Sequence, residues 1–178
     1  MSRPTKATAA GRAYLDLQSL ARKQRKVTAE LLTMYVVERW LARLAASPYR
    51  NDFVLKGGML LACLGARRPT VDADALARNM ASDEQTVVQR VVDIASIPMP
   101  EDGVQFDVST VRAQPIREES LYAGTRVRMN ARLATAAVRL SLDINFGDPV
   151  TPEPQMVELP PLRPGMEPIG ILGYPIET

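Results

Sequence analysis

The sequence contains no histidine and a single cysteine, and these two scarcities exclude several kinds of catalytic site. Without histidine, the chain cannot by itself form a Ser-His-Asp or Cys-His catalytic group, or an imidazole metal site. With Cys63 as its only thiol, it cannot form an intrachain disulfide or a thiolate zinc cluster. Any bound metal must therefore be held by oxygen atoms, which favours magnesium or manganese over zinc.

Long apolar runs are also missing, because no stretch approaches the roughly 20 residues that a membrane-spanning helix needs. The basic residues near the N-terminus are not followed by an apolar segment, so we expect no secretory signal. We therefore expect a cytoplasmic protein with no membrane partner. A length of 178 residues, with 46% hydrophobic and 24% charged residues, is typical of one folded domain with a substantial core.

The net charge is only +2, but it is unevenly distributed. Residues 1–50 contain ten Lys/Arg and three Asp/Glu, residues 51–111 contain five and nine, and residues 112–139 contain six and two. Basic flanks around an acidic centre suit a metal site that also binds a polyanion. A solvated amphipathic surface would give the same pattern, so charge alone does not decide between the two.

The hydrophobic pattern predicts an α+β fold with a mixed sheet and N-terminal helices. Apolar spacing predicts helices at residues 14–21, 27–46 and 59–64, and strands at residues 53–56 and 70–76. Ser82 is expected to cap a helix that runs to about residue 95. From residue 104 the period changes to two, and the clearest strand covers residues 138–146. Residues 149–178 contain eight prolines and are expected to wrap the body as an extended segment with room for one short strand.

Paired aspartates after a glycine pair are the most informative motif of the chain. Asp72 and Asp74 stand on one predicted strand, so their side chains point to the same face, roughly 6.5–7 Å apart. Two carboxylates at this spacing repel each other unless a cation lies between them, and magnesium meets that need. Asp143, on the polar face of strand 138–146, is predicted to be the third metal ligand and a proton acceptor, if the two strands are neighbours.

The residues before the aspartates supply groups for a triphosphate. Gly57 and Gly58 have no Cβ atoms, so their backbone N–H groups can approach a phosphate at a helix N-terminus. Lys56 and Arg68 are the predicted charge partners of the phosphates. Each element is common by itself, as a tight turn or a surface acid. Their joint occurrence in this order favours a nucleotidyl-transfer site.

These motifs resemble a known family. The segments Lys56-Gly57-Gly58, Arg68-Pro69-Thr70-Val71-Asp72-Ala73-Asp74 and Leu140-Ser141-Leu142-Asp143-Ile144-Asn145-Phe146-Gly147 are similar to those of AbiEii-type nucleotidyltransferase toxins. That family belongs to the DNA polymerase β-like nucleotidyltransferase superfamily and includes the MenT toxins of type IV-like toxin–antitoxin systems. The resemblance covers roughly residues 27–178, which are expected to form the nucleotidyltransferase domain, with residues 1–26 as a basic, flexible or helical extension.

The resemblance implies a toxin that transfers nucleotides from an NTP, most often CTP, to the 3′ end of tRNA, with a cognate antitoxin as partner. It assigns Asp72 and Asp74 to metal binding and Gly57-Gly58 to the first motif. Thr70 matches a hydroxyl residue that is phosphorylated in some relatives. The family continues into a helix with a functional lysine, whereas this sequence ends at Thr178. We therefore expect that the C-terminal helical part is missing.

Three functions remain open from the sequence. The first is a metal-dependent RNA nucleotidyltransferase toxin, in which the basic N-terminal region and the arginines at positions 126, 128, 132 and 139 receive the tRNA backbone. The second is a small-molecule nucleotidyltransferase of the antibiotic-modifying kind. The third is an inactive module that acts by binding its antitoxin.

Overall fold

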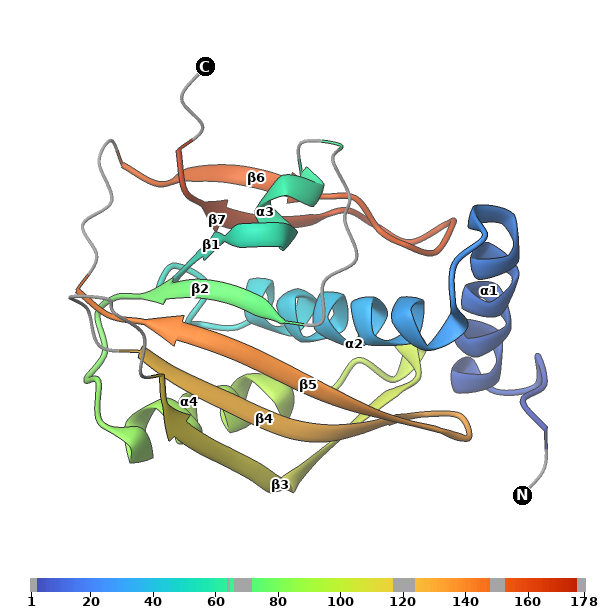
Figure 1. The fold of residues 1–178 in the computed structure, drawn as a ribbon, viewed down its shortest axis with the longest axis horizontal. Helices are drawn as coiled ribbons and strands as arrows, with labels where there is room; N and C mark the ends of the chain where they lie inside the picture. Colours follow the sequence, from blue (N-terminus) through green and yellow to red (C-terminus); the bar gives the residue numbers. More distant parts are fainter. Residues whose placement is uncertain (1–2, 64, 66–71, 117–123, 148–152, 176–178) are drawn as a thin grey trace.

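The computed structural model contains a mixed seven-stranded sheet with the strand order β3-β4-β5-β2-β1-β7-β6 (Figure 1). It describes residues 3–63, 65, 72–116, 124–147 and 153–175. The helices are α1 (Ala9–Gln24), α2 (Thr28–Ala45), α3 (Gly57–Cys63), α4 (Glu84–Ala95) and the 3₁₀ turn η1 (Pro100–Asp102). The strands are β1 (Phe53–Lys56), β2 (Ala73–Ala77), β3 (Val104–Pro115), β4 (Gly124–Leu133), β5 (Ala136–Asn145), β6 (Gln155–Leu159) and β7 (Ile169–Gly173).

The predicted α+β class and mixed sheet are confirmed, and so are the helix at 27–46 and the strand at 53–56. Two details differ. Helix α1 is longer than predicted, because Thr8 caps it by accepting a hydrogen bond from the N–H of Gly11. Helix α4 is capped by Asp83 rather than Ser82, and hydrogen bonds from Thr86 hold the pKa of the Asp83 carboxyl below its usual value.

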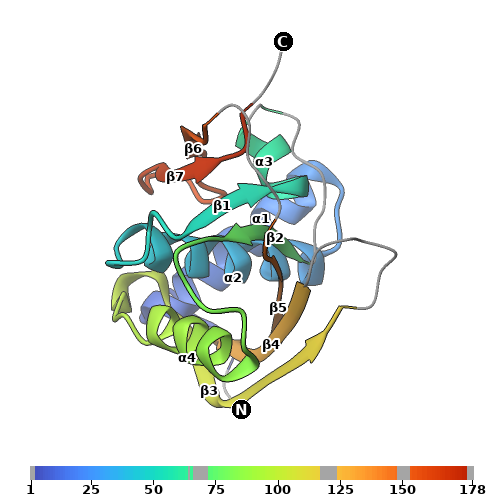
Figure 2. The same ribbon diagram turned by 90° about the vertical axis from the view of Figure 1, so that its left-hand side faces the viewer.

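Helices α1, α2 and α4 cover one face of the sheet, as Figure 2 shows. Helix α2 lies against β5 and β7, and α4 lies against β3 and β4. Trp40 of α2 meets Phe53 of β1 edge to face in this core, with ring centroids 6.0 Å apart. The N-terminal segment, which was expected to be a flexible or helical extension, contributes α1, and the apolar side of α1 packs on α2.

The C-terminal segment differs from the prediction, because it adds two strands to the sheet instead of one. Strand β7 pairs in parallel with β1, and β6 pairs antiparallel with β7 over five residue pairs. The prolines lie outside both strands, where no ladder hydrogen bond is required of them. This arrangement places the end of β7 beside Lys56, at the end of β1.

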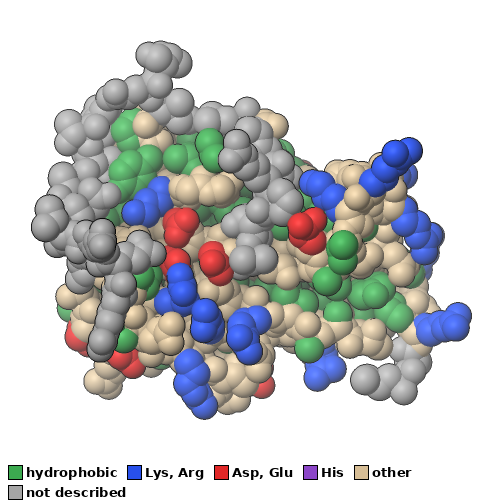
Figure 3. All heavy atoms as spheres, viewed as in Figure 1, with side chains coloured by type: hydrophobic (Ala, Val, Ile, Leu, Met, Phe, Trp, Pro, Cys, Tyr) green, Lys and Arg blue, Asp and Glu red, His purple; other side chains and the backbone are tan. Residues whose placement is uncertain are grey.

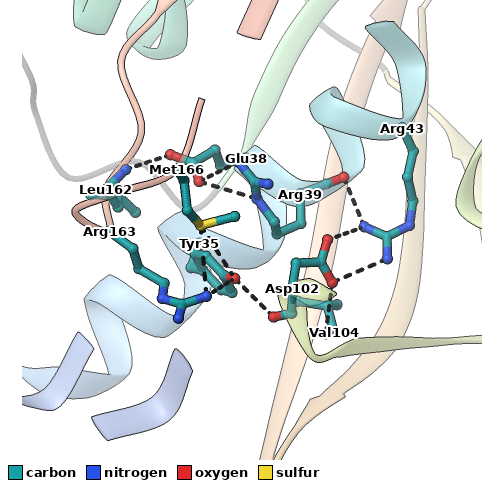
Figure 4. A network of polar contacts seen from close by, with 9 residues as sticks. All are labelled: Tyr35, Glu38, Arg39, Arg43, Asp102, Val104, Leu162, Arg163 and Met166. Carbon is teal, nitrogen blue, oxygen red and sulfur yellow. Dashed lines mark hydrogen bonds and ion pairs between the residues drawn. The ribbon is translucent and has the colours of Figure 1, made fainter. Parts of the chain in front are cut away.

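Buried polar side chains join this C-terminal segment to the helical layer (Figure 4). Glu38 of α2 is fully buried and accepts a hydrogen bond from the backbone N–H of Leu162 at 2.8 Å. Arg163 donates to the hydroxyl of Tyr35, which donates in turn to the carbonyl of Asp102. Burial raises the pKa of Tyr35 to about 12 against the opposing charge of Arg163, so the hydroxyl remains a donor at neutral pH.

On the opposite side of the sheet, strands β3, β4 and β5 present a polar surface, here called the open face. Along β4 and β5, buried apolar residues alternate with polar residues of this face, as the period of two predicts. In the part of the chain that the structure describes, no helix is long and apolar enough to cross a bilayer.

Candidate active site

Four charged residues of four neighbouring strands lie in one line across the sheet. Asp74 of β2 pairs with Asp143 of β5, Lys56 of β1 lies opposite Asp74, and Arg126 of β4 lies opposite Asp143. We call this line, Lys56–Asp74–Asp143–Arg126, the charged row. Neighbouring strands are roughly 4.8 Å apart, so the two acids are close enough to share a ligand.

The charged row confirms that the strand of Asp143 lies beside the strand of the paired aspartates. Asp72 lies one residue before β2 and is half-buried. Arg68 and Thr70 lie outside the described residues, so their predicted roles stay predictions. Among the described residues, no three acidic or cysteine side chains are grouped so that they could hold a metal ion. Asp72, Asp74 and Asp143 therefore do not form a ready-made metal cluster here.

The carboxylate of Asp143 forms a two-pronged ion pair with Arg126. The Nε atom donates to Oδ1 at 2.7 Å, and a terminal nitrogen donates to Oδ2 at 2.9 Å. The side chains are 28% and 14% exposed, respectively, so the pair is only partly screened by water. Arg126 was expected to contact an RNA backbone, and in this structure it binds a predicted catalytic acid instead.

Gly57 is a glycine for two independent physical reasons. Its backbone φ of +71° is one that residues with a Cβ atom rarely adopt. A Cβ atom at this position would also lie 2.5 Å from Oδ2 of Asp74, well inside contact distance. The backbone of the first glycine therefore packs directly on a predicted metal ligand, which the sequence did not indicate. Gly58 follows in the first turn of α3.

Replacing Gly57 by alanine is therefore expected to displace the Asp74 carboxylate. We expect a loss of about 1–2 kcal/mol of folding free energy from the left-handed backbone and, in an enzyme that depends on Asp74, about a hundredfold loss of activity from misplacement. Thermal unfolding and a transfer assay measure the two effects. Gly165→Ala is the matched control, because Gly165 has a similar φ of +83° and open space around its Cβ position. An equal loss of activity in both variants would contradict the role of the contact with Asp74.

Lys56 lies at the other end of the charged row, beside the end of β7. Its ammonium group is 5.9 Å from the centre of the Tyr174 ring. The N–H of Tyr174 donates to the carbonyl of Leu55, which fixes the ring next to the strand. Lys56 is half-buried, and its ammonium is thus positioned next to the charged row, as its predicted role as a phosphate partner requires.

Ser141 is a site residue that motif reasoning did not single out. It belongs to the open face of β5, two residues before Asp143, and it is 6% exposed. Its hydroxyl has no hydrogen-bond partner among the described residues. A buried polar group without a partner costs about 1–3 kcal/mol, and a bound water or ligand oxygen would relieve that cost. The only signal in the sequence was the alternation that puts Ser141 on the face of Asp143.

Arginines cover the open face next to the charged row. Arg128 lies opposite Ser141 and beside Arg112 of β3, and Arg132 and Arg139 lie farther along β4 and β5. Figure 3 shows this side of the molecule, where Lys and Arg side chains gather below a small group of acidic side chains. A hollow of about 630 Å³ lies along the same strands and is lined by residues that include Asn130, Arg132 and Arg139.

Comparison with known proteins places this site in a family. Residues 39–178 match the family described as "Nucleotidyl transferase AbiEii toxin, Type IV TA system". No curated protein sequence gives a significant match. Two solved structures from Helicobacter pylori are similar at 17% identity: JHP933, with a TM-score of 0.47, and a putative nucleotidyltransferase, with a TM-score of 0.45.

Each alignment with these structures covers 92% of this chain, and it covers 52% of JHP933 and 54% of the second protein. The chain thus spans about half the length of either protein. The family match is independent of these structures and includes every residue of the charged row, as well as Asp72 and Gly57-Gly58. The chain therefore belongs to the AbiEii family of nucleotidyl transferase toxins from type IV toxin–antitoxin systems.

Proposed function

We propose that the protein is a metal-dependent nucleotidyltransferase that adds nucleotides from an NTP, with CTP as the first candidate, to the 3′ end of tRNA. The family supports the reaction class and a cognate antitoxin as partner. The observation that carries the proposal is the register of Asp74 and Asp143 on neighbouring parallel strands. It brings together two carboxylates that a reaction on a triphosphate requires.

Three observations fit a divalent ion, Mg²⁺ or Mn²⁺, at this place. The carboxylates of Asp74 and Asp143 offer oxygen atoms on adjacent strands, and Asp72 lies one residue before β2. The missing Cβ of Gly57 leaves room for the Asp74 carboxylate. The hydroxyl of Ser141, which has no partner in the described part of the chain, offers a further oxygen two residues before Asp143.

When bound, the ion would supply neutralisation of the phosphate charge and a lower pKa for the attacking hydroxyl. The residues of the chain do the rest. Asp72, Asp74 and Asp143 would hold the ion, and Asp143 is the predicted acceptor of the proton from the attacking 3′-hydroxyl. Lys56, Gly57 and Gly58 orient the triphosphate, with Arg68 as a further predicted partner outside the described residues.

The arginines of the open face support a nucleic acid, rather than a small drug, as the acceptor. Arg128, Arg132 and Arg139 have no acidic partner among the described residues, and they extend from the carboxylates along two strands. Arg139 lies four positions before Asp143, about 13 Å along the strand, which is more than a small acceptor would need. A phosphate backbone is a chemically matched partner for such an array.

Removing these charges is expected to weaken RNA binding in a salt-dependent way. Each of Arg132→Gln and Arg139→Gln should reduce the slope of log affinity against log salt by about 0.7–0.9, because one phosphate contact is lost. Binding of labelled tRNA at several salt concentrations measures this slope. Arg50→Gln is the control, since Arg50 is exposed and lies outside the open face. Equal slopes in all three variants would favour the small-molecule acceptor.

Thr70 is proposed as the site of an inactivating phosphorylation. It lies outside the described residues, two positions before Asp72 in the sequence. A phosphate there would add about two negative charges near the carboxylates and would compete with the incoming triphosphate. Substituting Thr70 by valine would remove the modification while preserving the shape of the side chain.

The test of the proposed function is transfer of label from each α-labelled NTP to tRNA, with Mg²⁺ or Mn²⁺ present. Label in tRNA, but not in a mixture of small aminoglycoside-type acceptors, is the expected result. Absence of label from every acceptor, together with no heat of NTP binding in calorimetry, would favour the binding-only module. The same assay on a longer chain of this family is the positive control.

A further inference from the structure

The ion pair between Arg126 and Asp143 has a consequence for how the site takes up a metal ion. Both oxygens of Asp143 accept hydrogen bonds from one guanidinium, at 2.7 and 2.9 Å. Arg126 and Asp143 are direct partners in the β4–β5 ladder, so the backbone register places them together. The pair is therefore part of the sheet and not an incidental contact between mobile surface chains.

The guanidinium binds the carboxylate of Asp143, a predicted metal ligand, from the β4 side of the charged row. A carboxylate has about four lone-pair sites, and the two-pronged pair engages two of them. The same acid can be reached by a second cation only against the repulsion of the first. The side chains of Arg126 and Asp143 are only 28% and 14% exposed, so water and salt screen that repulsion incompletely.

We propose that Arg126 is a built-in counter-ion of Asp143, which a divalent ion must displace before Asp143 can act as a ligand. This inference rests on the proposed metal-dependent function and assigns a positioning role to a residue outside the sequence motifs. Arg126 holds the Asp143 carboxylate in place, and it lowers the affinity of the bare protein for metal.

The released guanidinium has a natural second partner. Arginine binds phosphate oxygens with the same two-pronged geometry that it uses for carboxylates. In the charged row, Arg126 stands next to the acids that would hold a metal–triphosphate complex. The phosphates of a bound nucleotide would thus be a new anionic partner for Arg126 when its guanidinium leaves Asp143. Metal and nucleotide are then expected to bind cooperatively, each raising the affinity for the other by the same factor.

The test measures Mn²⁺ binding to the full chain by electron paramagnetic resonance, without and with a non-hydrolysable NTP. Without nucleotide, Arg126→Gln is expected to bind Mn²⁺ about tenfold more tightly than the wild type, because a neighbouring positive charge is gone. With nucleotide, the gain in Mn²⁺ affinity should be smaller in Arg126→Gln than in the wild type. Unchanged or weaker Mn²⁺ binding by Arg126→Gln would overturn the inference.

Arg132→Gln is the matched control, because it removes the same charge from the same face of β4. Arg132 is six residues from Arg126, about 20 Å along the strand and beyond the screening length of roughly 8 Å. Its Mn²⁺ affinity should stay within about twofold of the wild type. A tenfold gain in this control as well would also overturn the specific role of Arg126.

Two further variants keep the outcomes separable. If Arg126→Gln does not fold, Arg126→Lys takes its place in the test. The lysine variant gives up one of the two hydrogen bonds and should gain about threefold in Mn²⁺ affinity. Asp74→Asn tests the proposed function independently, because it removes a predicted ligand and leaves the Arg126–Asp143 pair intact. If Asp74→Asn binds Mn²⁺ as the wild type does, the proposed metal site fails, and the role of Arg126 fails with it. If Asp74→Asn loses Mn²⁺ affinity but Arg126→Gln gains none, only the role of Arg126 fails.

Discussion

Asp74→Asn is expected to lower nucleotidyl transfer by about a thousandfold, while the fold stays intact. A metal ion contributes several kcal/mol to such a reaction, and each 1.4 kcal/mol is a factor of ten in rate. Asp74 lies at the centre of the charged row, between Lys56 and Asp143, so no neighbouring acid can take its place without moving a strand. Asparagine keeps the size of the side chain and removes its charge. The measurement is single-turnover transfer of label from an α-labelled NTP to tRNA.

Glu158→Gln is the matched control for this charge removal. Glu158 is exposed on β6 of the same sheet, two strands beyond β1. We expect transfer within about twofold of the wild type, because surface substitutions far from a site have small effects. Asp72→Ala should behave like Asp74→Asn. Undiminished transfer by both Asp72→Ala and Asp74→Asn would show that the paired aspartates do not carry the reaction.

The strands of the site could be predicted because their side chains alternate in the sequence. Val138, Leu140 and Leu142 on one side of β5, with Arg139 and Ser141 on the other, indicate a strand with one covered face. The same alternation puts Asp143 on the polar face. The adjacency of β5 and β2 was only an expectation, and the pairing of Asp74 with Asp143 now confirms it.

Lys56 was predicted as a site residue, but Arg126, at the other end of the charged row, was not predicted as a partner of Asp143. Arg126 is 17 positions from Asp143, and the pair depends on the exact register of the β4–β5 ladder. A shift of one residue would turn Arg126 toward the core, so the register is set by burial of Val127 and its neighbours. The sequence showed only an arginine on a polar face, which suits a phosphate equally well.

The number of C-terminal strands was predicted as one rather than two for a physical reason. Proline-rich composition argues against strand structure, because proline lacks the N–H that a ladder uses. Residues 155–159 and 169–173 nevertheless contain no proline, and they form a ladder in which β7 pairs with β1 and β6 pairs with β7. The composition averaged over 30 residues did not indicate the two proline-free segments of five residues each that form the strands. Tyr174, at the end of the second, consequently reaches Lys56.

The polar network under the sheet connects these strands with the helices that support the site. Arg43 of α2 forms an ion pair with Asp102 of η1, with a shortest distance of 2.9 Å and side-chain exposures of 3% and 1%. Asp102 also accepts a hydrogen bond from the N–H of Val104 at the start of β3. Figure 4 shows that this pair is continuous, through Tyr35, with Arg163 of the β6–β7 connection.

Breaking the Arg43–Asp102 pair is therefore expected to cause the largest loss of stability of any single change in this network. Asp102→Ala leaves the Arg43 charge buried without its partner, which costs about 3–5 kcal/mol. For a chain of this length, each kcal/mol corresponds to about 2–4 °C, so the midpoint of thermal unfolding should fall by about 10 °C. Circular dichroism during heating and urea unfolding measure the change in midpoint and in free energy.

The double variant Arg43→Met with Asp102→Ala separates the charge effect from the loss of packing. Since the uncompensated charge is absent, the double variant should be more stable than the sum of the single losses predicts. Asp52→Asn, which breaks the more exposed Arg90–Asp52 pair, should cost only about 1 kcal/mol. If Asp102→Ala and Asp52→Asn have equal effects, burial of the Arg43–Asp102 pair does not set the stability of the layer that supports β3 and β7. That layer would then owe its stability to apolar packing alone.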